Sequence, residues 1–146
     1  MDAKTYLEQV KMLNIKIKQL EERLACLRET AGGAAAIRYD KDNVQVSVQT
    51  DIVERNVIRI VEMEEKIFAE KVRLEATKNT IVEQIQGLND PRYVDLLFKR
   101  YINLESFERI AVDMSYDYTY TRALHGEAIG YFEMYYQNIL HNLTNE

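Results

Sequence analysis

The sequence predicts an all-α protein, and three observations carry that prediction. Two long segments, at about residues 3–29 and 51–86, have apolar side chains at helical spacing. The region after the single proline divides into shorter helical segments with good capping residues in front of them. The only alternating run, VQVSVQ, has no second strand to pair with, so no sheet is expected.

The first long segment carries a heptad seam. Its apolar residues recur in steps of three and four, as at the a and d positions of a coiled coil: Val10, Leu13, Ile17, Leu20, Leu24 and Leu27. Two interpretations stay open, since the seam either joins a second copy of the chain or folds back on the next helix. Gly32 and Gly33 are expected to end the helix, and a loop is expected over residues 30–50.

The second long segment is expected to begin at about Asp51, as N-cap, and to end at Gln86. Its apolar stripe comprises Val53, Val57, Ile60, Ile67, Leu74, Ile81, Ile85 and Leu88. The stripe is interrupted at seven-residue intervals by Glu64, Lys71 and Lys78. Either these polar groups set register and partner choice, or the stripe drifts so that another set is buried: Val61, Phe68 and Val72. The two segments together predict an antiparallel coiled-coil hairpin over residues 1–88.

The remaining residues, 89–146, are expected to form a helical head. Asp90 can cap its first helix, and Pro91 occupies a first helical position where a missing amide costs nothing. That helix should run to about Ile102. The C-terminal tail is rich in tyrosine and aliphatic residues, and either the long hairpin or a second subunit must cover it.

Within the head, the spacing from residue 106 onward is typical of a helix-turn-helix. Ser106 caps a first short helix, and Ala111 lies where only a small side chain fits between two crossing helices. Ser115-Tyr116-Asp117 forms the turn. The second helix carries three residues inward: Thr121, Leu124 and Ala128. In helix-turn-helix proteins this second helix enters the DNA major groove.

Four segments carry a resemblance to a known family: DPRYVDLLFKRYI, SFERIAVDM, SYDYTYTRALHGEAI and, upstream, RYDKDNVQVS. They resemble the small sigma-region-4-like proteins of Gram-positive phages and prophages, which are similar to the RinA and ArpU type of late-gene transcriptional activators. The resemblance covers roughly residues 37–132 and is tightest over 89–132. It implies a sequence-specific DNA-binding transcriptional regulator in the cytoplasm of a bacterial host, with RNA polymerase as a further partner.

Docking of the second helix in the usual way predicts the DNA-binding residues. Tyr118, Thr119 and Arg122 would face base edges, Arg109 would face the backbone, and Tyr120 offers a surface hydroxyl. The charge balance opposes generic DNA binding, because residues 92–146 hold five basic and eight acidic side chains. The alternative function is therefore a non-enzymatic helical adaptor that contacts RNA polymerase or a phage protein.

Other classes of protein find little support in the sequence. It has no glycine-rich phosphate loop and no His-Glu-x-x-His motif, and two histidines with one cysteine, Cys26, are a poor set for a metal site. We therefore expect no enzyme, cofactor or metal. No apolar run is long enough to span a membrane, no signal peptide is expected, and a lone cysteine fits a reducing cytoplasm. The seam and the aromatic tail predict a homo-oligomer, most simply a dimer.

Overall fold

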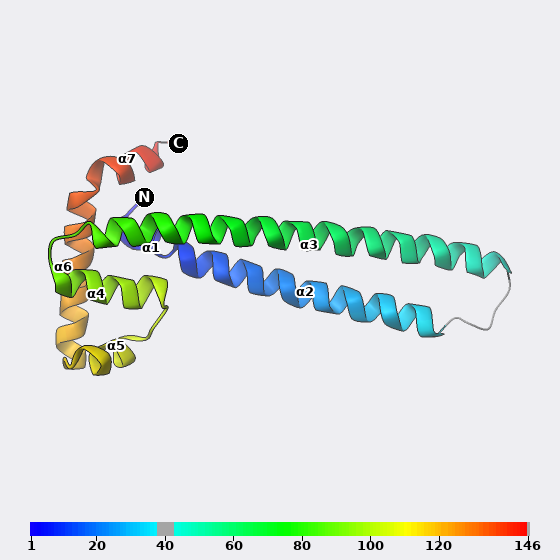
Figure 1. Cartoon of the computed structure of the whole chain (residues 1–146), viewed down its shortest axis with the longest axis horizontal. Helices are drawn as coiled ribbons and strands as arrows, with labels where there is room; N and C mark the ends of the chain where they lie inside the picture. The colour runs from blue at the N-terminus through cyan, green and yellow to red at the C-terminus, as the bar shows by residue number, and fades with distance from the viewer. Residues whose placement is uncertain (38–42, 146) are drawn as a thin grey trace. The chain divides into compact units, whose positions relative to one another are not determined.

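The computed structural model describes residues 1–37 and 43–145, with side chains for residues 1–30 and 50–145. Every element in this part of the chain is helical (Figure 1), so the all-α prediction is confirmed there. The chain divides into two compact units. We call Asn14–Arg73 the hairpin unit, and Met1–Leu13 together with Leu74–Glu146 the head unit. The head unit thus takes in both ends of the predicted hairpin, whereas the sequence placed the boundary at residue 88.

The hairpin unit consists of parts of two long helices, α2 (Gln9–Ile37) and α3 (Asn43–Gln86), which lie side by side in Figure 1. Two exposed ion pairs join them: Arg28 with Glu64, and Lys71 Nζ with Glu21 Oε1 at 3.0 Å. Residue numbers rise on one helix as they fall on the other, so the helices are antiparallel.

The prediction of a loop over residues 30–50 is wrong, because helix covers most of this range. α2 continues to Ile37, and α3 begins at Asn43. Residues 38–42, which belong to the upstream segment of the family resemblance, lie outside the described residues. Three successive alanines favour helix and offset Gly32 and Gly33, each of which costs roughly 1 kcal/mol relative to alanine. Asp51 therefore lies inside α3 and does not cap it.

The heptad seam of α2 is covered within one chain. Val10, Leu13, Ile17 and Leu24 are buried, and Leu20 and Leu27 are half-buried. Of the two interpretations that the sequence left open, folding back within the chain accounts for this burial. The seam is therefore not free to serve as the interface of the predicted dimer.

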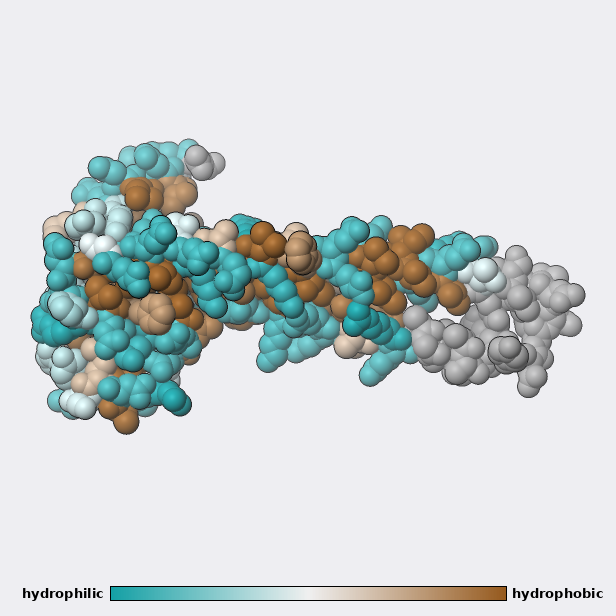
Figure 2. All heavy atoms as spheres, viewed as in Figure 1, coloured by the Kyte–Doolittle hydropathy of each residue, from teal (hydrophilic) through white to brown (hydrophobic). Residues whose placement is uncertain are grey.

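The predicted stripe of α3 is only partly buried. Ile67, Leu74, Ile81, Ile85 and Leu88 are buried, whereas Val57 is 51% exposed. The drifting-stripe alternative is wrong, since its three residues remain in solvent: Val61, Phe68 and Val72. These residues, together with Val57 and Ile58, form an exposed apolar face of α3, which we call the α3 stripe. Hydrophobic side chains, brown in Figure 2, reach the surface along the long helices.

The head unit is built around α6. Its further elements are α1 (Ala3–Leu7), α4 (Pro91–Leu97), the π-helical η1 (Phe98–Ile102), α5 (Phe107–Met114), α6 (Tyr118–Tyr135) and α7 (Gln137–Thr144). α1, α4 and α5 all pack against α6. Asp90 caps α4 and Ser106 caps α5, as predicted. The first predicted helix is broken at Glu8, between α1 and α2.

The same chain covers part of the aromatic tail, while Tyr135, Ile139 and Leu143 stay exposed. Phe132 is fully buried, with its ring 6.2 Å from Tyr6 and 4.8 Å from Tyr136, measured between centroids. The hydroxyl of Tyr136 donates to the backbone oxygen of Gln84 at 2.7 Å. A Cβ on Gly87 would lie 2.7 Å from that hydroxyl, so any larger residue there would displace the Tyr136 side chain. The sequence left open whether the long hairpin or a second subunit covers the tail. For Phe132 and Tyr136, α1 and the end of α3 in the same chain provide the contacts.

Candidate nucleic-acid interface

A tight turn joins α5 to α6. Ser115 has left-handed backbone angles (φ 59°, ψ 38°), and the amide of Tyr116 donates to the carbonyl of Ala111 at 2.9 Å, which ends α5. Asp117 Oδ1 then accepts a hydrogen bond from the amide of Tyr120 at 2.7 Å and caps α6. The three-residue turn and both of its ends are therefore fixed by hydrogen bonds.

The inner faces of α5 and α6 pack closely. Ala111 is 6% exposed, and Leu124 and Ala128 are fully or almost fully buried, as the spacing predicted. Thr121 is the one buried polar side chain among the described residues. Its hydroxyl donates to the carbonyl of Asp117 at 2.8 Å, so burial leaves no donor unpaired. Because Ala111 is almost fully buried, we expect a larger side chain at this position to be overpacked.

The outer face of the first turns of α6 is open to solvent. It presents four of the five predicted DNA-binding residues: Tyr118, Thr119, Tyr120 and Arg122. Arg122 Nη1 donates to the Tyr118 hydroxyl at 3.1 Å, so these two side chains act as one unit. The Tyr120 hydroxyl accepts a hydrogen bond from Arg92 at 2.9 Å and stays accessible.

The fifth predicted residue, Arg109, lies apart on α5. Its Nε is 3.5 Å from Glu105 Oε1 and 3.9 Å from Asp113 Oδ2. Arg92 is likewise paired with Asp90 at 2.9 Å, and that hydrogen bond lowers the pKa of the Asp90 carboxyl. Arg109 and Arg92, which could contact DNA phosphates, are thus already paired with carboxylates.

Sequence reasoning missed a cluster around Phe107. The guanidinium of Arg100 lies 4.1 Å from the centre of the Phe107 ring, and that of Arg122 lies 4.7 Å from it. The His125 ring meets Phe107 edge to face at 4.9 Å. We call these four residues the Phe107 cluster. Arg122 and His125 share a helical face, but only the packing of η1 and α5 on α6 brings the other two to them.

His125 lies in the Phe107 cluster and is half-buried. Its Nε2 is 2.7 Å from the Tyr101 hydroxyl. Burial lowers the pKa of His125 to about 4, with further lowering by the positive charges of Arg100, Lys4 and Arg122. Burial also raises the pKa of Tyr101 to about 12. Both groups are therefore neutral at pH 7, and their hydrogen bond is a structural one.

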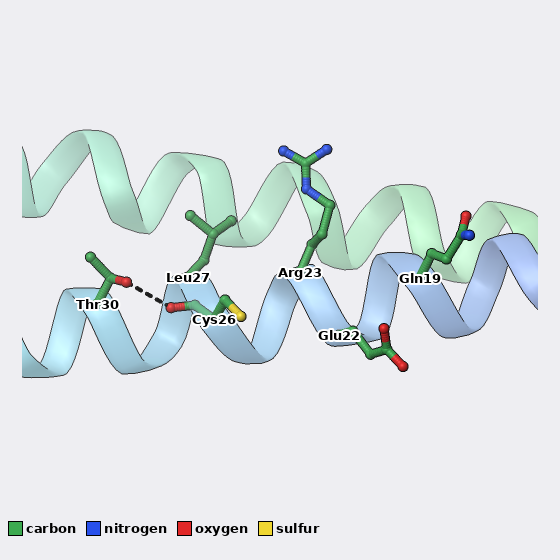
Figure 3. A pocket seen from close by; sticks show the side chains of 6 residues that line it. All are labelled: Gln19, Glu22, Arg23, Cys26, Leu27 and Thr30. Atoms are coloured by element: carbon green, nitrogen blue, oxygen red, sulfur yellow. Dashed lines mark hydrogen bonds between the residues drawn. The ribbon is translucent and has the colours of Figure 1, made fainter.

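Two hollows lie on the surface of the described residues. One of about 610 Å³ lies along α2, and Figure 3 shows its six lining side chains fanned out along the helix instead of converging. Another, of about 380 Å³, is lined by residues between Gln86 and Phe98. Among the described residues no group of three or more His, Cys, Asp or Glu could hold a metal ion. No helix in that part of the chain is long and apolar enough to cross a membrane.

Comparison of the chain with protein-family models, curated proteins and solved structures finds no match. The resemblance to sigma-region-4-like phage proteins stays a prediction from the sequence.

Proposed function

We propose that α5 and α6 form a helix-turn-helix and that the protein is a sequence-specific DNA-binding regulator of transcription. The observation that carries the proposal is the α5–α6 unit itself, with its three-residue turn, left-handed Ser115 and Asp117 cap. In this motif the N-terminal residues of the second helix contact bases. The phage or prophage setting, and RNA polymerase as a partner, rest on the resemblance alone.

Tyr118 and Thr119 are the residues best placed to read bases. Both are exposed at the first turn of α6, where neither is tied to a carboxylate. A hydroxyl can donate to or accept from base edges, and the threonine methyl can contact that of thymine. Arg109 contributes less than the sequence indicated, because Glu105 and Asp113 already offset its charge.

Selection of bound fragments from random double-stranded DNA, followed by sequencing, tests this proposal. We expect a preferred motif, and we expect Thr119→Ala to weaken binding to that motif by about 1–3 kcal/mol while changing the preference at one base pair. Thr80→Ala, at an exposed position of α3, is the matched control and should leave binding unchanged. Failure to enrich any motif, alone or with RNA polymerase, would contradict sequence-specific binding.

A homodimer is part of the proposal, since two heads suit two half-sites. The α3 stripe is the surface for a second copy, because four of its five residues are spaced symmetrically about one midpoint. Val57 and Val72 lie at equal distances along the sequence from a midpoint between Glu64 and Glu65. Val61 and Phe68 also lie at equal distances from this midpoint. Two antiparallel copies would place each residue of a pair opposite the other.

Sedimentation should give twice 17.2 kDa, and Phe68→Glu should give a monomer of unchanged helicity. A wild-type monomer at micromolar concentration would contradict the dimer.

The second candidate function is the helical adaptor. The observation that favours it is the pairing of cations in the head with carboxylates, which leaves little free positive charge for phosphate. An adaptor would bind its protein partner equally well with and without DNA. Capture of RNA polymerase by a protein that shows no salt-sensitive DNA binding would favour this function over the first.

A further inference from the structure

The basic residues between Arg92 and Arg122 fall into two groups. Three of them have a carboxylate oxygen within 4.0 Å: Arg92, Lys99 and Arg109. Arg100 and Arg122 have no such partner among the described residues. These two are also the pair that share the ring of Phe107. In a chain of net charge −5, the two basic residues of this segment that lack a carboxylate partner thus lie at one place.

The ring and two hydrogen bonds hold both guanidiniums in position. Arg100 Nη1 donates to the carbonyl of Glu105 at 3.0 Å, and Arg122 Nη1 donates to the Tyr118 hydroxyl. A guanidinium has five N–H donors in a fixed plane, so most donors of each arginine remain free. Because stacking on Phe107 already restricts both side chains, less entropy is lost when they bind a ligand.

Burial and the positive charge near the Phe107 cluster both lower the pKa of His125. Lys4 on α1, Arg100 on η1 and Arg122 on α6 each act on the ring of His125, which lies against Phe107. Three elements thus direct positive charge to one region. Phosphate suits arginine in particular, because its oxygens match the planar fork of donors.

We propose that Arg100 and Arg122, held on Phe107, form a phosphate-binding pair for the backbone of double-stranded DNA. The proposal rests on the DNA-binding function above and assigns different work to different residues. Arg122 contacts phosphate instead of a base edge, and Arg100, which the sequence did not suggest, contributes equally. Sequence preference then resides with Tyr118 and Thr119, whereas affinity and salt dependence reside with the arginine pair.

The salt dependence of binding to a 30-base-pair duplex of mixed sequence tests the pair. Each lost phosphate contact should reduce the slope of log affinity against log salt by about 1 and weaken binding roughly five- to tenfold at 100 mM salt. We expect this for Arg100→Gln and for Arg122→Gln. Arg55→Gln is the matched control, with the same change in charge at an exposed position of α3 outside the head unit, and should leave the slope unchanged. Equal slopes for all three variants and wild type would overturn the proposal.

Two further measurements separate folding effects and the two proposals. Arg100→Lys keeps a charge at the site and should preserve the slope, provided that the melting temperature is that of wild type. If the arginine variants lose slope but no DNA motif is ever enriched, the phosphate pair stands and sequence-specific regulation falls. If wild type binds no DNA, inorganic phosphate becomes the probe: shifts of the Arg100 and Arg122 Nε–H resonances, without a shift at Arg109, support an anion site, and their absence overturns it.

Discussion

The hairpin unit and the head unit bury their side chains in different ways. The ten largest fully buried side chains, from Leu7 to Phe132, all belong to the head unit. In the hairpin unit each helix buries a single seam, and another face of α3 keeps large apolar residues in solvent. A residue in the head therefore loses contacts on all sides when it is truncated, whereas one in the hairpin unit loses them on one side.

Ion pairs occur in both units, and in the head unit side chains also cap the helices. Cross-helix ion pairs of the hairpin unit are solvent-exposed, with about half of each side chain accessible. In the head unit, charged and polar side chains cap the helices: Asp2, Asp90, Ser106 and Asp117. Capping fixes where a helix begins, while exposed pairs add little stability. The head is thus the more closely specified part, which is what a binding surface needs.

The largest expected effect comes from truncating a leucine in the head. Leu124 is 1% exposed, and Leu124→Ala should lower the free energy of unfolding by about 2–5 kcal/mol, since a cavity remains at the α5–α6 contact. Leu27→Ala, at a half-buried position of the hairpin unit, should cost about 1 kcal/mol. Denaturant titration followed by circular dichroism measures both. Similar losses would show that the two units are equally well packed.

A small-to-large change gives the next effect. Ala111→Leu should cost about 1–3 kcal/mol, because α5 and α6 cross closely at this residue. Ala25→Leu, at an exposed position of α2, should change stability by less than about 0.5 kcal/mol. Both can be measured as shifts in melting temperature. An unchanged melting temperature for Ala111→Leu would show that residues 106–131 do not pack as a helix-turn-helix.

Much of the fold could be predicted from the sequence because its signals are local. Helical spacing gave both long helices, and Asp90, Ser106 and Asp117 cap the helices that they were expected to cap. The start of α3 was placed wrongly at Asp51, since the valine alternation before it suggested an extended segment. With no partner strand, that alternation carries no pairing energy, and helix covers most of the segment.

The site was harder to predict, because packing between elements creates it. The exposed residues at the start of α6 followed from the capping residue and helical period, and the structure exposes them as expected. Arg100 and Phe107 gave no such signal, since they lie on two elements separated by a chain reversal in which Leu104 takes a left-handed conformation (φ 56°). The pairing of Arg109 with two carboxylates also depends on side-chain geometry, although their four-residue spacing allowed it.

Protonation of His125 should destabilise the head by a smaller amount. The ring binds a proton near pH 6.5 in the unfolded chain but only near pH 4 in the folded one. Between these values the unfolded state binds more protons, so stability is complete above about pH 6.5 and decreases as the pH falls towards 4. We expect a loss of about 1–2 kcal/mol, because the half-buried ring keeps part of its hydration. His125→Gln should flatten the curve in this window, and an unchanged pH dependence would contradict the burial of His125.

The smallest effect should come from the ion pairs of the hairpin unit. Glu21 and Lys71 lie 3.0 Å apart, but both side chains are about half exposed, so water screens their attraction. A double-mutant cycle with Glu21→Gln and Lys71→Met should give a coupling of about 0.2–1 kcal/mol at low salt, decreasing as salt is added. The single substitutions leave the buried seam intact, so helicity should not change. A coupling above about 2 kcal/mol would show that α2 and α3 are held together by charge. The hairpin unit and the head unit would then differ in the kind of interaction that stabilises them and not in its strength.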